Sequence, residues 1–114
     1  MAFRLAMLGD MPRHAAVLRL AADKAGAELL LSVNSQNLHL AQELQCTPVI
    51  IQDFGKGLDS LAANIEAIER MGVTRYLIDP ILAPIGFGFT ESLARYTETR
   101  RRFPQTEILM GVGN

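Results

Sequence analysis

The sequence predicts an α/β protein with a parallel β-sheet, because strand-length apolar runs alternate with segments of helical periodicity along the chain. Five such runs occupy residues 3–8, 29–33, 49–51, 76–78 and 108–110. Apolar residues recur every three or four positions between these runs, which is typical of helices that cover one face of a sheet. Each helix returns the chain to the starting end of the next strand, so the strands should be parallel.

The first two connecting segments contain signals that begin and end helices. Pro12 suits the opening turn of the first helix, where a missing N–H costs nothing, and Gly26 ends that helix. A shorter helix is expected over about residues 37–45, between the second and third strands.

The last two connecting segments predict longer helices. Asp59 is the predicted N-cap of one helix, and Gly72 should follow its last turn. Thr90 is the predicted N-cap of the final helix, which should end before Pro104. The apolar face of the first of these two helices consists of Leu61, Ile65 and Ile68.

Two architectures accommodate this order of elements in a single domain that spans residues 1–114. One is a section of a (β/α)8 TIM barrel, a fold that takes about 250 residues when complete. The other is an open, doubly wound sheet of about five strands. The chain stops at the glycine-rich stretch MGVGN directly after an apolar run, so we expect it to be a fragment of a longer protein.

The composition excludes several classes of partner. The 11 Lys and Arg residues balance 12 Asp and Glu residues, so no overall field attracts nucleic acid or a membrane. Cys46 is the one cysteine, which rules out an internal disulfide and favours a reducing compartment, the cytoplasm. No apolar run approaches the roughly 18 residues of a membrane-spanning helix, and no Cys/His spacing is typical of a zinc site.

Polar residues follow the predicted strands at the ends where parallel α/β proteins place their sites. Their carboxylates and amides suit recognition of a flat heterocycle with hydrogen-bond donors and acceptors on its edge, and none is an obvious nucleophile. In chain order these residues are Asp10, Asn34, Ser35, Asn37, Gln52, Asp53 and Asp79.

The segment DPILAPIGFGFTESLARY, residues 79–96, is the most informative of these strand ends. The carboxylate of Asp79 ends a strand that should be buried on both faces, and a loop of proline, glycine and phenylalanine follows. Glycines let a backbone approach a ligand closely, and aromatic rings can stack on one. The loop residues expected at a ligand site are Gly86, Phe87, Gly88 and Phe89, together with Gly111, Gly113 and Asn114.

Three passages resemble the dihydropteroate synthase-like, pterin-binding enzymes, in particular a branch linked to tetrahydromethanopterin one-carbon metabolism. They are AGAELLLSVNSQN at 25–37, the segment at 79–96 quoted above, and EILMGVGN at 107–114. The resemblance implies a (β/α)8 barrel of which this chain supplies about strands three to seven. It also implies that Asp79, Asn34 and Asp10 bind the pterin.

Members of this family are transferases that join a pterin methylene to an aromatic amine with loss of pyrophosphate. The resemblance therefore implies a pterin ligand, no tightly bound cofactor, and Mg²⁺ only as a companion of a pyrophosphate substrate. The Ser-Arg-Lys motif of the synthases should follow the seventh strand, where this chain has GVGN, so we expect the chain alone to be inactive. An incomplete barrel leaves sheet edges open, which favours a homo-oligomer.

Two other functions fit the same residues. One is a non-catalytic pterin-binding or assembly module, which the missing lysine favours. The other is a methyltetrahydropterin-dependent methyltransferase domain, since such enzymes share the barrel and hold the ring with Asp and Asn. A corrinoid partner would distinguish the methyltransferase.

Overall fold

The structure, a computed structural model, describes residues 28–112 and confirms the alternation of strands and helices there. The predicted first strand and the helix between Pro12 and Gly26 lie outside the described residues. The elements are β1 (Leu29–Val33), α2 (Leu38–Glu43), β2 (Thr47–Ile50), α3 (Gly57–Arg70), β3 (Leu77–Ile78) and α4 (Phe89–Arg102). This part of the chain therefore has an α/β fold.

The three strands form a parallel sheet in the order β1-β2-β3, as the alternation predicts. The predicted strand at 108–110 is reduced to one parallel bridge, between Ile108 and Ile78. Pro80 gives the physical reason, because it has no N–H and cannot extend the ladder beyond Asp79. The segment at 108–110 therefore pairs with β3 only briefly.

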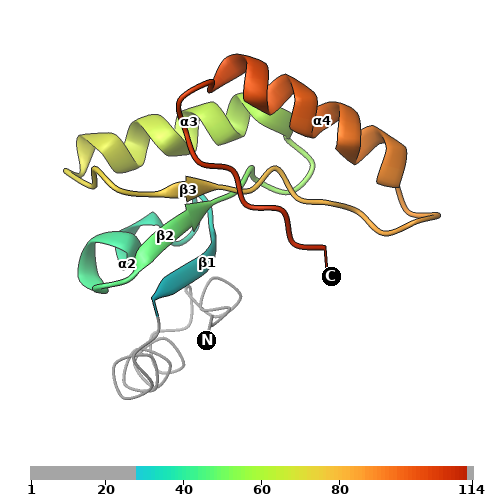
Figure 1. Cartoon of the computed structure of the whole chain (residues 1–114). Coiled ribbons are helices and arrows are strands. Elements are labelled where there is room, and N and C mark those ends of the chain that lie inside the picture. The colour runs from blue at the N-terminus through green and yellow to red at the C-terminus, as the bar shows by residue number, and fades with distance from the viewer. Residues whose placement is uncertain (1–27, 113–114) are drawn as a thin grey trace.

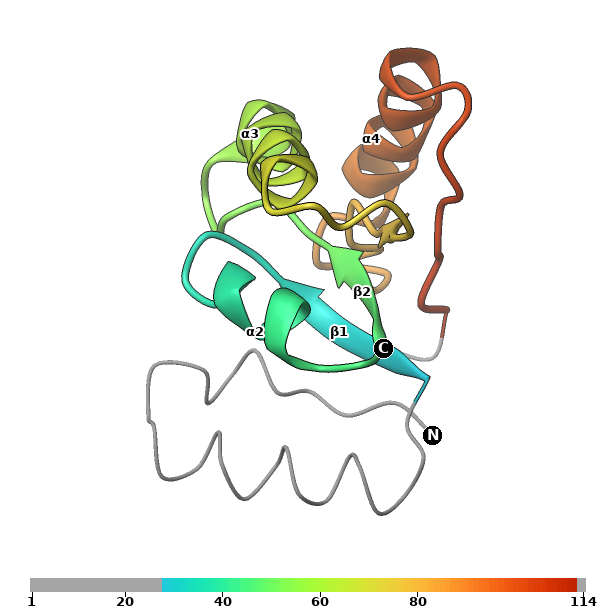
Figure 2. The same ribbon diagram turned by 90° about the vertical axis from the view of Figure 1, so that its left-hand side faces the viewer.

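The helices follow one another around one side of the strands. Figure 1 shows α3 and α4 beside each other above the sheet, and Figure 2 shows α2, α3 and α4 in succession. The chain thus passes from strand to neighbouring strand without reversing direction across the sheet.

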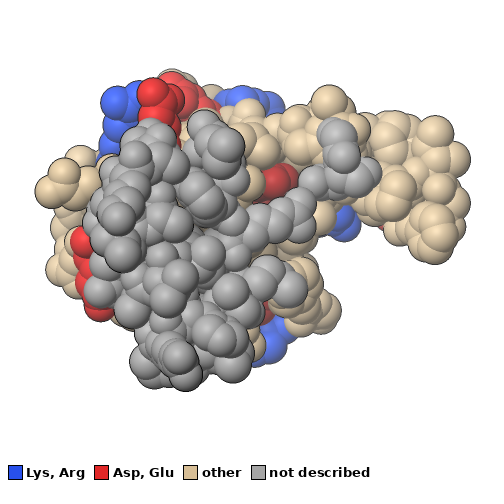
Figure 3. Space-filling model, turned by 90° about the horizontal axis from the view of Figure 1, so that it is seen from below, with Lys and Arg blue, Asp and Glu red and all other residues tan. Residues whose placement is uncertain are grey.

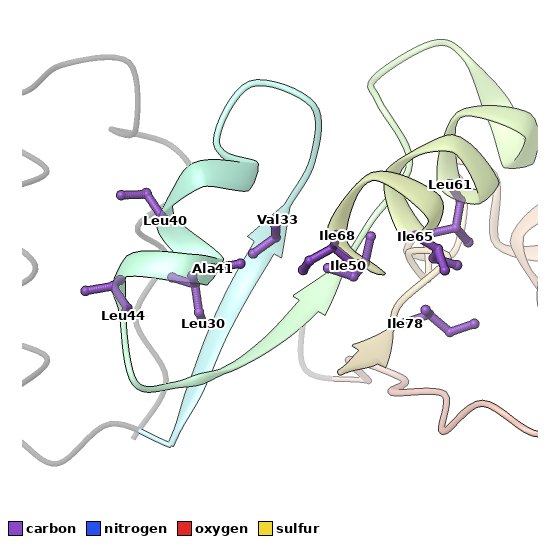
Figure 4. Close-up of a cluster of buried hydrophobic side chains, with 10 residues drawn as sticks. All are labelled: Leu30, Val33, Leu40, Ala41, Leu44, Ile50, Leu61, Ile65, Ile68 and Ile78. Carbon is purple, nitrogen blue, oxygen red and sulfur yellow. The ribbon is translucent and has the colours of Figure 1, made fainter. Parts of the chain in front are cut away.

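The hydrophobic core fills the space between the sheet and helices α2 and α3 (Figure 4). The apolar face predicted for α3 is confirmed, because its three residues are all buried in this cluster. The cluster consists of Leu30, Val33, Ile50 and Ile78 from the strands, Leu40, Ala41 and Leu44 from α2 and its end, and Leu61, Ile65 and Ile68 from α3.

The predicted N-cap of α3 is wrong. The helix begins at Gly57 with Lys56 as its N-cap, so Asp59 lies within the first turn. A negative charge is favourable there because of the helix dipole, and Asp59 also accepts a hydrogen bond of 2.8 Å from Arg102 of α4. The other end of the helix agrees with the prediction, since Gly72 follows it with a φ of 89°.

The predicted N-cap of α4 is also wrong. The helix begins one residue before Thr90, and its N-cap is Gly88. Gly88 has a φ of 100°, a left-handed backbone conformation that a residue without a Cβ adopts at little cost. The backbone freedom of glycine, rather than a capping hydroxyl, therefore sets the start of α4.

The loop between β3 and α4 protrudes from the rest of the described structure (Figure 1). The protruding end carries no charged side chain on the face seen in Figure 3. Its tip is apolar, with Ile85 83% and Phe87 79% exposed.

Among the described residues, no helix has the length and apolar character needed to cross a membrane.

Candidate functional site

The carboxyl ends of the three strands place polar side chains on one edge of the sheet. Asn34 follows β1 and Asp79 follows β3, while Gln52 lies just beyond the central strand β2. Backbone hydrogen bonds hold these ends in register, from Asp79 N–H to the Ile50 carbonyl at 2.9 Å and from Ile51 N–H to the Val33 carbonyl at 2.8 Å. The predicted site residues Asp10, Gly113 and Asn114 lie outside the described residues.

The carboxylate of Asp79 is held by one of its two oxygens. Oδ1 accepts hydrogen bonds from the Ile81 N–H at 2.8 Å and from the Tyr96 hydroxyl at 2.9 Å. Within residues 28–112, Oδ2 has no hydrogen-bond partner. Among the described residues, the carboxylate is therefore fixed in place by one oxygen while the other has no partner.

Tyr96 joins Asp79 to the segment at 108–110. Its hydroxyl lies 3.0 Å from the Leu109 carbonyl as well as 2.9 Å from Asp79, and its one hydrogen can be donated to only one of them at a time. Burial, and then the neighbouring Asp79 carboxylate, raise the pKa of Tyr96 well above its ordinary value of 10.0. The hydroxyl therefore stays protonated and acts as a donor at neutral pH.

The turn after Asp79 has a strained backbone that several donors hold. Ile81 has a φ of 68°, which is unfavourable for a β-branched residue. The Pro80 carbonyl accepts hydrogen bonds from Gln52 Nε2 at 2.9 Å and from Arg95 Nε at 2.6 Å. Arg95 also donates to the Ile81 carbonyl. These contacts fix the turn that carries the carboxylate.

Gln52 has one amide atom paired and one unpaired. The residue is only 8% exposed, and its Nε2 donates to Pro80. Its Oε1 is buried and has no hydrogen-bond partner among the described residues. Leaving such an acceptor unpaired costs about 1–3 kcal/mol.

Asn34 is buried in a local hydrogen-bonded turn. It is 5% exposed, and its Oδ1 accepts the Gln36 N–H at 3.0 Å. Its backbone N–H donates to Asn37 Oδ1 at 2.8 Å, and Asn37 Nδ2 donates to the Ser32 carbonyl at 3.2 Å. Asn37 thus organises the turn, and the amide nitrogen of Asn34 has no hydrogen-bond partner among residues 28–112.

Asp53 has a structural position at the same edge. Its carboxylate accepts hydrogen bonds from the Ser35 N–H at 3.0 Å, the Ser35 hydroxyl at 2.7 Å and Asn64 Nδ2 at 3.2 Å. Burial acts to raise the pKa of Asp53, but hydrogen bonds from Ser35 and Asn64, with the charge of Lys56, lower it below its ordinary value of 3.8. Asp53 therefore ties the loop after β1 to the loop after β2 rather than facing a ligand.

We expect Asp53→Asn to lower the free energy of unfolding at pH 7 by about 1–2 kcal/mol, because hydrogen bonds to a charged acceptor are lost. The pKa of Asp53 in the folded protein is lower than its ordinary value of 3.8, which it has in the unfolded chain. The stabilisation is therefore complete above pH 3.8 and is lost as the pH falls through the pKa of the folded state. Urea unfolding from pH 7 to pH 2 should thus show the variant and the wild type converging in acid. Glu107→Gln is the control, since Glu107 is exposed and its side chain has no partner in the described part of the chain. A constant difference across the pH range for Asp53→Asn would contradict the assignment.

Two of the predicted glycine and phenylalanine residues, Phe89 and Gly111, line a cavity, whereas Gly86, Phe87 and Gly88 do not. Gly86 and Gly88 both have positive φ, which shapes the loop. Phe87 is exposed at the tip, whereas Phe89 lines a cavity of about 280 Å³ together with Gly111. The other residues that line the cavity are Leu82, Ala83, Pro84, Ile85 and Val112. Two distant loops predicted to meet at a site thus share one apolar cavity.

Arg95 and Tyr96 are site residues that the strand ends alone did not indicate. Tyr96 lies on the buried face of α4 with Ser92 and Thr99, at helical spacing, and this polar pattern is the signal that could have identified it.

In residues 28–112, no group of three or more His, Cys, Asp or Glu residues could hold a metal ion.

The fold and the site together define a parallel α/β protein with a polar, carboxylate-containing sheet edge and with an apolar cavity between the loop after β3 and residues 111–112. Comparisons with protein-family models, with curated proteins and with solved structures found no match to this chain.

Proposed function

We propose that this chain is a pterin-binding, dihydropteroate synthase-like protein in which Asp79 captures the ring. The observation that carries the proposal is the carboxylate of Asp79, held at Oδ1 by two donors while Oδ2 is without a partner in the described part of the chain. A fixed carboxylate oxygen accepts N–H groups, and the amino-pyrimidine edge of a pterin presents such groups.

The positions of Asn34 and Asp79 suit a bicyclic ligand. They follow the two strands that flank β2, so about 10 Å of sheet, two strand spacings, lies between their backbones. Side chains that reach inward from both ends could contact opposite sides of one fused ring system. Asn34 would supply its amide nitrogen as a donor, complementing the acceptor of Asp79.

The arrangement of elements supports a section of a (β/α)8 barrel over a doubly wound sheet. A doubly wound sheet reverses its strand order and carries helices on both faces, whereas here the order is sequential and α2 and α3 share one face. We propose that the chain forms a homo-oligomer, as expected of an incomplete barrel. The single cysteine, Cys46, is consistent with a cytoplasmic location.

The apolar cavity supports a second subsite for the family's reaction. Its lining, which includes Phe89 and Gly111, suits an aromatic ring. In the proposed reaction an aromatic amine attacks the pterin methylene, and the bond to pyrophosphate breaks, with Mg²⁺ accompanying the pyrophosphate. Positioning of the two rings would supply most of the rate enhancement.

Titration of the wild-type chain with 7,8-dihydropterin, followed by ligand fluorescence, tests the proposal. We expect saturable binding that is about tenfold weaker for 7,8-dihydrolumazine, in which a carbonyl replaces the amino group and one hydrogen bond is lost. The absence of saturable binding of either compound at millimolar concentration would eliminate the proposal. Turnover of pterin pyrophosphate with an aminobenzoate would separate an enzyme from a binding module.

A further inference from the structure

The peptide group between Pro80 and Ile81 connects α4 and the segment after β2 to the carboxylate of Asp79. We propose that this peptide group is a positional relay: the hydrogen bonds that Arg95 and Gln52 donate to its carbonyl fix the orientation of the whole group. Its N–H is thereby held where it keeps the Asp79 carboxylate in the orientation that receives a ligand. Arg95 is then a positioning residue for the site. The role of the ligand rests on the proposed function, whereas the positioning of Asp79 does not.

The geometry of a peptide group makes the relay physically direct. The group is planar, and in its trans form the C=O and the N–H point in opposite directions. Here the carbonyl end accepts from Gln52 Nε2 and Arg95 Nε. The N–H end donates to Asp79 Oδ1 at 2.8 Å. Any rotation that frees the N–H from Asp79 would also break both hydrogen bonds to the Pro80 carbonyl.

The strain at Ile81 shows that these contacts determine the backbone conformation. A φ of 68° is unfavourable for isoleucine and persists only when surrounding contacts impose it. Arg95 imposes it with two donors, one to the Pro80 carbonyl and one to the Ile81 carbonyl. A planar guanidinium can bridge two successive carbonyls in this way, whereas the single ammonium of lysine is a point donor.

The relay also affects how Asp79 meets a ligand. Hydrogen bonds at the carbonyl polarise the peptide group, which makes its N–H a stronger donor to the carboxylate. With Oδ1 held by this N–H and by the Tyr96 hydroxyl, the direction of Oδ2 is set before a ligand arrives. A ligand then binds without the entropy cost of ordering the carboxylate.

Arg95→Met tests the relay, with Arg101→Met as the matched control on the same helix. Arg101 is 77% exposed and pairs only with Glu98 among the described residues. The first readout is hydrogen exchange of the Ile81 amide measured by NMR in the full chain without ligand. We expect exchange about tenfold faster in Arg95→Met and unchanged in Arg101→Met, because local opening becomes easier. Arg95→Lys should restore part of the protection.

The second readout is the affinity for 7,8-dihydropterin, which should fall by about tenfold in Arg95→Met, the loss of roughly one net hydrogen bond. Unchanged exchange of the Ile81 amide in Arg95→Met would overturn the relay. If the amide of Ile65 in the core exchanges faster as well, Arg95→Met has lost global stability. The exchange rate of the Ile81 amide is then measured in Gln52→Met, where an unchanged rate would overturn the relay. Absence of pterin binding by the wild type would count against the proposed function alone, since amide exchange still judges the relay.

Discussion

Asp79→Ala should weaken binding of 7,8-dihydropterin by about 10- to 100-fold. A hydrogen bond to a charged group contributes about 1.5–3 kcal/mol, and each 1.4 kcal/mol or so is a factor of ten in affinity. The substitution removes Oδ2, the proposed ligand acceptor, and also leaves the Ile81 N–H and the Tyr96 hydroxyl without the oxygen that both contact. Fluorescence titration of wild type and variant measures the effect.

Asp79→Asn separates recognition from positioning. The asparagine oxygen can still accept from Ile81 and Tyr96, but the ligand then meets an NH2 group where the carboxylate had an acceptor. We expect the asparagine variant to keep wild-type unfolding behaviour and still to lose most of its affinity. Affinity equal to that of the wild type in both variants would remove Asp79 from the site.

Ile68→Ala should lower the free energy of unfolding by about 3–4 kcal/mol. Ile68 is fully buried in α3, in the cluster with Ile50 and Ile78 of the neighbouring strands. Removing three methylene-sized groups from such a site costs the transfer free energy of the lost atoms and the energy of the cavity that remains. Alanine is a good helix former, so the effect reports packing and not helix propensity.

Ile85→Ala is the matched control for the core substitution. The same chemical change at a side chain that is 83% exposed should alter stability by no more than about 0.5 kcal/mol. Urea unfolding measures both variants, and an unchanged slope would show that the midpoint shift is a change in stability. Equal effects of the two substitutions would contradict the position of the core between the sheet and α3.

The strands and helices of residues 28–112 could be predicted because local pattern decides them. Apolar runs of strand length and a helical face such as that of α3 can be recognised in the sequence without knowledge of any tertiary contact. The errors fall at boundaries. Gly88 starts α4 through its backbone conformation, and Pro80 restricts the pairing of residues 108–110 by withholding a donor.

The candidate site was predicted less completely than the fold. Asp79, Asn34 and the glycine loops could be named as candidates from the sequence because sites in parallel α/β proteins form at the carboxyl ends of strands. Arg95 and Tyr96 were not, because they lie on a helix, and only the tertiary fold brings that helix into contact with Pro80 and Asp79. Asp53 is equally polar and also follows a strand, but its carboxylate already accepts hydrogen bonds from Ser35 and Asn64.

The sequence by itself determined the α/β class, the parallel direction of the strands and the polar character of their carboxyl ends, since these depend on periodicity and residue type within short segments. Only the tertiary structure decided which polar groups pair with one another and which have no partner among the described residues. The physical reason is that hydrogen-bond pairing depends on distance and direction between residues far apart in the chain. The left-handed backbone at Ile81, fixed by Gln52 and Arg95, is the clearest case.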